Sequence, residues 1–312
     1  MKQDKKVVVT GGAGFIGSHL TGSLVRRGYN VKVLDDLSTG KLRNIEGLIS
    51  ENDIDFIRGS VTNLSLLQKL FRDVSCVFHL AAIPSVPRSI DEPLPCHQVN
   101  ASGTLKVLLA ARDNRVNKVI YSSSSSVYGD TPVLPKKENM LPDPQSPYAV
   151  AKLAGEYYCR VFHKVYGLAT VCLRYFNVFG PGQDPDSQYA AVIPRFIKSC
   201  FEGNSPTIFG DGEQTRDFTF VKDVVSANLL AEESNASGVF NISRGDSITI
   251  NRLAEYIIEL TGSNVEPVYQ RARPGDIKHS SADISKAEAF GYKPLYDLET
   301  GLAETIKWFK GV

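Results

Sequence analysis

The feature that most constrains the fold of this chain is a glycine-rich turn directly after the first predicted strand. Val7–Thr10 is a short β-branched run, and Gly11-Gly12-Ala13-Gly14-Phe15-Ile16-Gly17 follows it. Apolar residues at helical spacing then continue to about Arg27. A strand, a glycine turn and a helix in this order predict a βα unit of a parallel sheet, with the turn at the carboxyl edge of that sheet.

The glycines have the spacing G-x-x-G-x-x-G, which differs from the usual G-x-G-x-x-G dinucleotide-binding fingerprint but serves the same physical ends. Gly11 permits a tight turn, Gly14 lets a pyrophosphate approach the backbone, and Gly17 lets the helix pack closely on the strand. The N–H groups of the first helical turn, which includes Phe15 and Ile16, would then bind phosphates. A tight βα turn without a ligand is the alternative interpretation.

An acidic residue at the end of the second predicted strand favours the dinucleotide. Asp35 follows Val31–Leu34 and lies 24 residues after Gly11, near the spacing of a ribose-binding carboxylate. Such a carboxylate accepts hydrogen bonds from ribose hydroxyls and repels a 2′-phosphate, so we expect NAD rather than NADP. Lys41 and Arg43 would argue the other way, but they lie beyond a Ser-Thr-Gly turn.

Alternation of strands and helices continues through the first half of the chain and predicts a Rossmann-like, doubly wound parallel sheet. The further predicted strands are Asp55–Ile57, Cys76–Leu80 and Lys118–Tyr121, and helical spacing is seen in Leu64–Phe71 and Gly103–Arg112.

Prolines and glycines interrupt the pattern beyond residue 180, and helical spacing returns at Ile250–Thr261 and Leu298–Trp308. We predict a smaller C-terminal α/β substrate lobe. The expected domains are residues 1–180, which bind the cofactor, and residues 181–312, with about 216–235 returning to the first domain.

Composition excludes several classes of partner. The 35 basic and 34 acidic residues nearly balance, so we expect no nucleic-acid partner. Apolar runs are strand-sized, so we expect no membrane partner. The N-terminus lacks the apolar stretch of a signal peptide, and five scattered cysteines contain no C-x-x-C pair, which predicts reduced thiols in the cytoplasm and no metal site.

Tyr148-Ala-Val-Ala-Lys152 is the second specific signal. Residues four apart share one face of a helix, so the Lys152 ammonium is expected beside the Tyr148 phenol, where it would favour the phenolate and lower the phenol's pKa. A phenolate can act as general base toward a sugar hydroxyl. An exposed helix pair is the alternative when this motif is considered alone.

A run of serines, Ser122–Ser126, follows the fifth predicted strand, where a nicotinamide should lie. Its hydroxyls can hydrogen-bond the reacting oxygen and exchange a proton with Tyr148, and Ser124 is the residue we select. A flexible serine linker is the alternative. No acidic residue occurs in residues 122–128, so chemistry that needs an extra acid beside the sugar, such as elimination of water, is disfavoured.

With these motifs the chain resembles the extended short-chain dehydrogenase/reductase family, and within it the UDP-sugar 4-epimerases. The resemblance covers nearly the whole chain and rests on residues 10–17, 79–82, 122–129, 148–152, 174–180, 216–218 and 273–276. Related dehydratases and decarboxylases typically carry an acid in the serine block, which is absent here.

A narrower resemblance is to bacterial UDP-N-acetylhexosamine 4-epimerases of the O-antigen pathway type, which implies polysaccharide biosynthesis. It rests on residues 85–89, 183–185, 189–194 and 279–283. Ser280 aligns with a tyrosine of the glucose-specific enzymes, and Ala191 stands where a bulkier asparagine is usual. Both small residues would make room for an N-acetyl group at C2.

The resemblance also implies binding residues. For the cofactor, besides the residues already named, these are Asp36, Ser38, Gly40, Ser60, Val61, Leu80, Ala81, Ala82, Asn100, Ser122, Ser123, Tyr175 and Val178. For the substrate they are Ser85, Asn177, Gln183, Ala191, Val192, Phe209, Arg216, Arg273, Asp276 and Ser280, with Ser124 and Tyr148. Within these sets the two arginines would hold the diphosphate, Asp276 the uridine ribose and Phe209 the uracil ring.

Two residues depart from the family pattern. Pro84 replaces a glycine before Ser85, and Ser60 stands where an aspartate usually contacts adenine.

The implied reaction is the epimerisation of UDP-N-acetylglucosamine and UDP-N-acetylgalactosamine at C4. Tyr148 takes the proton of the 4-hydroxyl as hydride passes to NAD, the 4-keto sugar turns over, and hydride returns to its other face. UDP-glucose/UDP-galactose and UDP-glucuronate are the alternative substrates, and a non-catalytic NAD-binding regulator is an alternative of another class. A homodimer built on helices near Gly103–Arg112 and Lys152–Val165 is expected by analogy.

Overall fold

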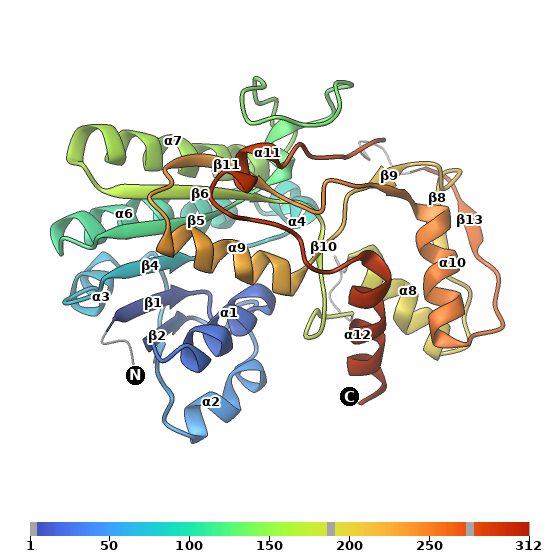
Figure 1. Cartoon of the computed structure of the whole chain (residues 1–312), viewed down its shortest axis with the longest axis horizontal. Coiled ribbons are helices and arrows are strands. Elements are labelled where there is room, and N and C mark those ends of the chain that lie inside the picture. The colour runs from blue at the N-terminus through green and yellow to red at the C-terminus, as the bar shows by residue number, and fades with distance from the viewer. Residues whose placement is uncertain (1–4, 186–190, 273–277, 312) are drawn as a thin grey trace.

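A computed structural model describes residues 5–185, 191–272 and 278–311 of the chain, and its centre is a parallel sheet of seven strands. The strand order is β11-β6-β5-β4-β1-β2-β3, and every neighbouring pair runs parallel (Figure 1). These strands are β1 (Lys6–Thr10), β2 (Asn30–Asp35), β3 (Ile54–Arg58), β4 (Cys76–His79), β5 (Lys118–Ser124), β6 (Ala169–Tyr175) and β11 (Gly238–Ile242).

Helices cover both faces of this sheet because its strands bury side chains on both sides. Val7 and Val9 of β1 pack into one core cluster and Val8 into the other, as the two-residue period of a strand requires. The helices of the main body are α1 (Phe15–Arg26), α2 (Glu46–Ser50), α3 (Leu64–Leu70), α4 (Val86–Asp91), α5 (Pro93–His97), α6 (Thr104–Asp113), α7 (Pro147–Tyr166), α9 (Val221–Glu233) and α11 (Ser285–Glu288).

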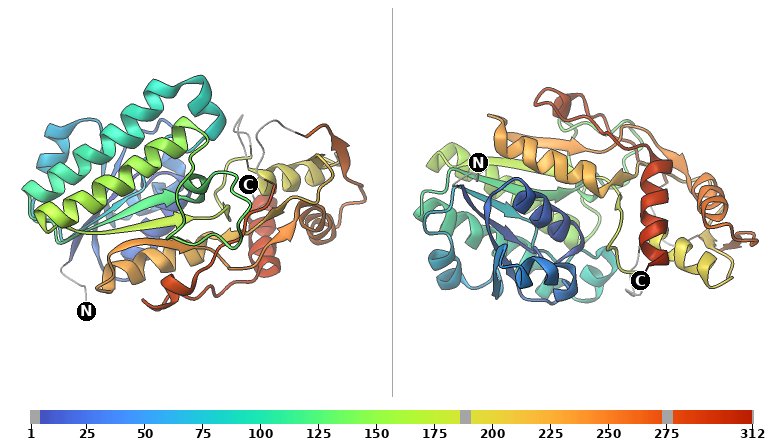
Figure 2. Two further views of the ribbon diagram at one scale, coloured as in Figure 1. Left: turned by 90° about the horizontal axis from the view of Figure 1, so that it is seen from above. Right: turned by 60° about the horizontal axis from the view of Figure 1, so that its bottom comes forward.

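The two helical layers are distinct. α1 packs against α9 on one face, and α3, α6 and α7 pack in sequence on the other. Figure 2 shows α6 and α7 lying side by side. Short 3₁₀ turns at Leu42–Asn44 and Ser125–Tyr128 and a π-helical turn at Gln98–Gly103 complete this part of the chain.

The remaining elements form a smaller lobe with its own apolar core beyond the carboxyl edge of the sheet (Figure 1). Phe196 and Ile197 from one helix meet Leu253 and Ile257 from a second and Leu302 from a third. The elements are β7 (Val178–Phe179), α8 (Val192–Phe201), β8 (Thr207–Phe209), β9 (Thr215–Arg216), β10 (Thr219–Phe220), β12 (Ile248–Thr249), α10 (Ile250–Thr261), β13 (Val268–Gln270) and α12 (Leu298–Lys310).

The predicted fold class is confirmed, with two additions. Strands β6 and β11 were not predicted and widen the sheet, and β5 continues to Ser124, so the first serines of the run belong to the strand. The division into domains stays a prediction, although α9, from the returning segment, packs against β5 and β6 of the sheet. Among the described residues, no helix combines the length and apolarity needed to cross a membrane.

Candidate active site

The glycine turn forms a cradle between the ends of β1 and β4. Gly11 has φ +72°, and a Cβ there would lie 2.7 Å from the backbone nitrogen of Ala81. A Cβ on Gly17 would lie 2.0 Å from the Gly11 carbonyl oxygen, so only glycine allows α1 to begin this close to the turn. No side chain caps α1, which leaves the N–H groups around Phe15 and Ile16 to face an anion. The cradle therefore fits a dinucleotide pyrophosphate.

Asp35 ends β2 beside this cradle and its carboxylate is fixed. Oδ2 accepts a hydrogen bond from the Ala13 N–H at 3.0 Å, and Oδ1 accepts one from the Leu37 N–H at 2.8 Å. A Cβ on Gly40 would lie 2.9 Å from both carboxylate oxygens, so the glycine backbone closes over the acid. Burial raises the pKa of Asp35 while the two N–H donors lower it. Asp36 differs, because its carboxylate accepts from the Ser38 N–H in a local turn.

The loops after β3 and β4 line the same edge. Ser60 accepts hydrogen bonds from the N–H and hydroxyl of Thr62, and Val61 is buried in the core. The N–H groups of Leu80 and Ala81 are bonded to Thr10, and Ala82 follows them half-buried.

Asn100 was expected at the pyrophosphate, and the structure gives its amide another role. Oδ1 accepts from the Ile83 N–H at 2.8 Å, and Nδ2 donates to the Ile83 carbonyl at 3.1 Å and to Cys96. Asn100 is 1% exposed. It therefore holds the loop that follows β4, and its contact with a pyrophosphate stays a prediction.

Tyr148, Ser124 and Lys152 meet where β5 ends and α7 begins. The Tyr148 phenol lies near enough to the Ser124 hydroxyl for that hydroxyl to lower its pKa, and the Lys152 Nζ lies 5.8 Å from the centre of the Tyr148 ring. Ser146 caps α7 by accepting from the Ala149 N–H, and Ser89 of α4 accepts from the Tyr148 N–H at 3.1 Å. Lys152 is buried and donates to the Ser122 carbonyl at 2.7 Å. The expected pairing of phenol, hydroxyl and ammonium is thus present.

The pKa of Tyr148 was expected to be lowered by Lys152, but in this structure it is raised. Removal of water raises the pKa of Tyr148 to about 12, and the hydrogen bond with Ser124 offsets part of that rise. Burial lowers the pKa of Lys152 to about 8, while the charge of Glu156 acts in the opposite direction. Lys152 therefore still carries its charge near pH 7, and desolvation is the largest influence on the pKa of the phenol.

A buried ion pair behind these residues fixes α7 to the sheet. The Arg174 Nε and Nη2 donate to the two carboxylate oxygens of Glu156 at 2.8 and 2.6 Å, and both side chains are 2–3% exposed. Ser123 donates to the same carboxylate at 2.5 Å. The Ser123 hydroxyl is therefore bound by Glu156, and a contact of Ser123 with the cofactor stays a prediction.

Tyr175 closes the other side of the serine strand. It lies opposite Ser124 in the β5–β6 register, and its hydroxyl is 3.0 Å from the Ser122 Oγ. Asn228 of α9 donates to that hydroxyl at 2.8 Å. The ring is thereby held at the edge where the sequence predicts the nicotinamide.

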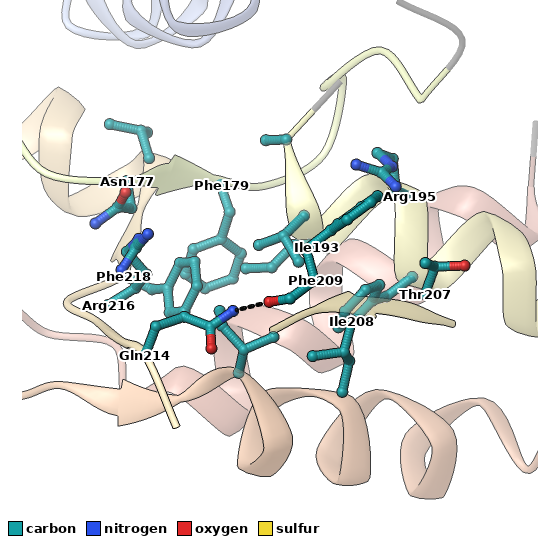
Figure 3. A pocket seen from close by; sticks show the side chains of 15 residues that line it. Asn177, Phe179, Ile193, Arg195, Thr207, Ile208, Phe209, Gln214, Arg216 and Phe218 are labelled. Carbon is teal, nitrogen blue, oxygen red and sulfur yellow. Dashed lines mark hydrogen bonds between the residues drawn. The ribbon is translucent and has the colours of Figure 1, made fainter. Parts of the chain in front are cut away.

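A pocket begins two residues beyond β6 and extends into the smaller lobe (Figure 3). Asn177 and Arg216 lie at one end of it, and Arg195 and Thr207 lie at the other (Figure 3). The structure brings together in this lining six of the predicted residues, which are Asn177, Val178, Ala191, Val192, Phe209 and Arg216.

Other predicted substrate residues lie outside that lining. Ser85 caps α4 by accepting from the Arg88 N–H, and Gln183 donates to the Val178 carbonyl. The Ser280 N–H donates to the Thr215 carbonyl at 3.1 Å, which places Ser280 next to Arg216 but outside the pocket wall. Arg273 and Asp276 lie outside the described residues.

Several site residues were missed by the sequence reasoning. Gln214 lines the pocket and donates to the Phe209 carbonyl at 2.8 Å, and the Arg195 guanidinium lies 5.6 Å from the Phe209 ring centre. Gln214 stands two residues before Arg216, so the strand period could have indicated it. Glu156 stands four residues after Lys152, so the helix period could have indicated it.

A buried carboxylate next to Arg216 was also missed. Asp217 is 0% exposed and accepts from the Arg244 and Ala282 N–H groups at 3.3 and 3.1 Å. Burial raises its pKa to about 6. Asp217 thus ties the strand of Arg216 to the segment that carries Ser280. Among the described residues, no three His, Cys, Asp or Glu side chains are grouped as metal ligands.

Comparison with known proteins gives consistent matches along the chain. Residues 7–243 match the model of the NAD dependent epimerase/dehydratase family. A UDP-N-acetylglucosamine 4-epimerase from Methanobrevibacter ruminantium M1, solved with UDP-N-acetylmuramic acid, is 48% identical over 99% of both chains, with a TM-score of 0.96. A UDP-glucuronic acid 4-epimerase from Bacillus cereus, solved with UDP-glucuronic acid and NAD, is 37% identical over 98% of this chain and 99% of its own, with a TM-score of 0.91.

A further relative is also named as a UDP-sugar 4-epimerase. The UDP-glucose 4-epimerase of Mycolicibacterium smegmatis is 37% identical over 98% of each chain. The three relatives carry the names of three different UDP-sugar 4-epimerases. This similarity establishes the family, but it does not identify the sugar of the UDP-sugar substrate.

Proposed function

The chain belongs to the NAD dependent epimerase/dehydratase family, and from that premise we propose that it inverts C4 of UDP-hexoses, with UDP-N-acetylglucosamine and UDP-N-acetylgalactosamine as its main pair. NAD is the cofactor of this family, and when bound it accepts a hydride from the sugar and returns it. The observation that carries the proposal is that Tyr148, Ser124 and Lys152 lie together at the carboxyl end of β5, with the Lys152 Nζ 5.8 Å from the centre of the Tyr148 ring.

In this proposal the protein moves one proton and holds the 4-hydroxyl of the sugar against the nicotinamide ring of the cofactor. Tyr148 takes the proton of the 4-hydroxyl and gives it back, while Ser124 bonds the reacting oxygen. Lys152 fixes the end of β5 through the Ser122 carbonyl and contributes its charge. A phenol with a pKa near 12 needs a further positive charge close by before it can act as a base near neutral pH, and an oxidised nicotinamide ring would supply one.

The pocket supports a UDP ligand. Arg216 provides a guanidinium at the end near Asn177, where a diphosphate would enter from the catalytic edge. Phe209 offers an aromatic face to uracil, with Arg195 on its other side and Gln214 fixing its backbone. Arg273 and Asp276 complete this set by resemblance to the family.

Two small residues support the N-acetylated pair over the glucose pair. Ala191 lines the pocket at the start of α8, and Ser280 is held beside the strand of Arg216. A tyrosine or asparagine at these positions would occupy space that an acetamido group at C2 needs. The relative named for UDP-N-acetylglucosamine has the highest identity of the three compared.

The test is incubation of the purified protein with UDP-glucose, UDP-galactose, UDP-N-acetylglucosamine and UDP-N-acetylgalactosamine, without added NAD, followed by separation of the C4 epimers. UDP-glucuronate is a fifth substrate in the same assay. We expect the largest kcat/KM for the N-acetylated pair. Ser280→Tyr should lower that value selectively, and Ser280→Ala is its matched control. Equal turnover of N-acetylated sugars by Ser280→Tyr would refute the role of Ser280.

We also propose a homodimer that uses α7. Exposed apolar side chains recur on this helix at Val150, Tyr157, Val161 and Val165, a spacing that places them along one stripe. A stripe of this kind on an outer helix is suited to packing against a second copy. The cytoplasmic location predicted from the free cysteines stays a prediction.

A further inference from the structure

The loop that closes over the ribose-binding acid is joined by an ion pair to the segment that leads into the substrate pocket. The Lys41 Nζ lies 2.7 Å from the Asp184 Oδ2. Lys41 follows Gly40, whose backbone closes over the Asp35 carboxylate, and the Lys41 N–H donates to the Ala13 carbonyl at 3.0 Å. Asp184 lies between β7 and α8, eight residues before the first residue of α8.

A second contact holds the same segment against the first turns of α1. The His19 Nε2 donates to the Pro181 carbonyl at 2.7 Å, and a Cβ on Gly182 would contact His19 and Phe15 at 3.8 and 4.0 Å. Burial lowers the pKa of His19, so the neutral ring is the donor. In Figure 1 the segment after β7 runs down beside α1.

Together these contacts link three segments around the start of α1: the glycine turn, the Lys41 loop and the segment that carries Asp184. The glycine turn is bonded to the Lys41 loop, the Lys41 loop is paired with Asp184, and the Asp184 segment is bonded to α1. A dinucleotide whose pyrophosphate lies at the N-terminus of α1 and whose ribose lies on Asp35 would be inside this ring. Its departure would require one of the contacts to open.

We infer that the Lys41–Asp184 pair is a clasp that slows release of NAD and thereby keeps the cofactor bound between turnovers. This inference rests on the proposed function, since an epimerase returns its hydride and has no need to exchange NAD. The pair also engages the Lys41 ammonium, one of the two cations after β2 that could attract a 2′-phosphate. Lys41 is 39% and Asp184 33% exposed, so the pair is a surface pair and its effect is modest and sensitive to salt.

The test is a double-mutant cycle on NAD release from the purified holoenzyme, with Lys41→Ala, Asp184→Ala and the double variant. The readout is the rate at which bound NAD appears in the dialysate, and it is independent of any sugar. We expect each single variant to release NAD about three to five times faster than the parent, the double variant to be no faster than either single variant, and the differences to vanish near 1 M salt.

Arg27→Ala, Glu233→Ala and their double variant form the matched control. That pair is 2.6 Å long and 45–47% exposed, and it joins the ends of α1 and α9 away from the carboxyl edge. Its removal should leave NAD release unchanged. Equal release from all variants, or strictly additive effects of Lys41→Ala and Asp184→Ala, would overturn the clasp and leave the proposed function intact. Failure of the parent protein to bind NAD at all would overturn both. If the protein purifies without NAD, the same cycle is measured on the Kd obtained by titration.

Discussion

At the scale of single residues, two opposing effects set the pKa of the Tyr148 phenol. Desolvation raises its pKa to about 12, and the hydrogen bond with Ser124 lowers it. In the proposed mechanism Ser124 would therefore act on the base as well as on the substrate oxygen. The sequence could indicate both residues from motif and strand position, but it could not indicate the sign of the pKa shift, because burial is a property of the folded chain.

Replacing Ser124 by alanine should slow the reaction and move its pH dependence. Loss of the hydrogen bond raises the pKa of Tyr148, so we expect kcat near pH 7 to fall about ten- to hundredfold and to recover in part at higher pH. The measurement is kcat/KM from about pH 6 to 10, with Ser124→Thr as the control that keeps the hydroxyl. A Ser124→Ala profile parallel to that of the parent would show that Ser124 does not tune the base.

Replacing Lys152 by methionine should abolish activity yet stabilise the cofactor-free fold. Lys152 is 4% exposed and its folded pKa is about 8, below the value of a free lysine, so below pH 8 the folded state carries the cost of a buried charge. We expect the free energy of unfolding to rise by about 1–3 kcal/mol near pH 7.

The pH dependence of that gain gives an independent check. Between about pH 8 and 10.5 the unfolded lysine binds more protons than the folded one, so the parent gains stability and the advantage of Lys152→Met is lost. Urea unfolding at several pH values measures this. The exposed Lys69→Met is the control and should change stability by less than about 0.5 kcal/mol. A constant difference between Lys152→Met and the parent across this range would contradict the assigned pKa.

At the scale of elements, α7 carries Tyr148 and Lys152, the proposed catalytic residues, and the Glu156–Arg174 pair joins this helix to β6. Glu156 stands on the same helix face as Lys152, one turn further on, and Arg174 lies in β6 opposite Ser123. Rotation or sliding of α7 would break both charge-assisted bonds. The pair therefore fixes where Tyr148 meets Ser124.

Glu156→Gln should destabilise the protein strongly. It removes one charge from a buried pair and leaves Arg174 uncompensated, which costs about 3–5 kcal/mol. Chemical denaturation measures the change, and Glu233→Gln in the exposed pair with Arg27 is the control, with an expected cost below about 1 kcal/mol. The double variant Glu156→Leu with Arg174→Met should regain most of the loss. A small effect of Glu156→Gln would show that α7 is held by packing alone.

The sequence predicts local elements better than it predicts their partners. The helix over Ile250–Thr261 has the predicted bounds, and β1 and β2 extend by one or two residues beyond their predicted runs. The edge strand β11 was not predicted, because its pairing with β6 joins Gly238 to Val171, far away in the chain. Arg174 in the interior of β6 donates two hydrogen bonds to Glu156, a pairing that the linear pattern of a strand cannot show.

In the candidate site, too, features set locally by the sequence could be predicted better than contacts between distant segments. Residues at strand ends and in the glycine turn could be predicted, since a parallel sheet brings the carboxyl ends of its strands to one edge. Ser123 and Asn100 are expected at the cofactor by resemblance to the family, but the sequence could not show that the Ser123 hydroxyl bonds Glu156 or that the Asn100 amide bonds Ile83. Contacts of this kind are set by tertiary packing.

At the scale of the whole molecule, two units with separate cores meet at the carboxyl edge of the sheet, and Asn177 follows directly from β6 into the pocket. The proposed dimer uses the helical layer formed by α3, α6 and α7, through the stripe of exposed apolar side chains on α7. Catalysis and association would then share one helix, whose other face carries Tyr148 and Lys152.

Val161→Glu together with Val165→Glu should convert the proposed dimer into monomers. Both side chains are exposed, at 46% and 65%, so the isolated chain should tolerate the change, whereas a second copy packed on them could not. Sedimentation velocity measures the mass, and Val268→Glu, at an exposed residue of β13, is the control. An unchanged mass for the double variant would place the interface elsewhere.

The central claim is that the protein removes and returns the same hydride at C4 of a UDP-hexose. The most direct measurement uses UDP-N-acetylglucosamine that carries deuterium at C4, incubated with the holoenzyme in ordinary water without added NAD, and records the product by NMR. We expect UDP-N-acetylgalactosamine with deuterium kept at C4, and no conversion by Tyr148→Phe above about a thousandth of the parent rate. Product with hydrogen at C4, or no product from any UDP-hexose, would contradict it.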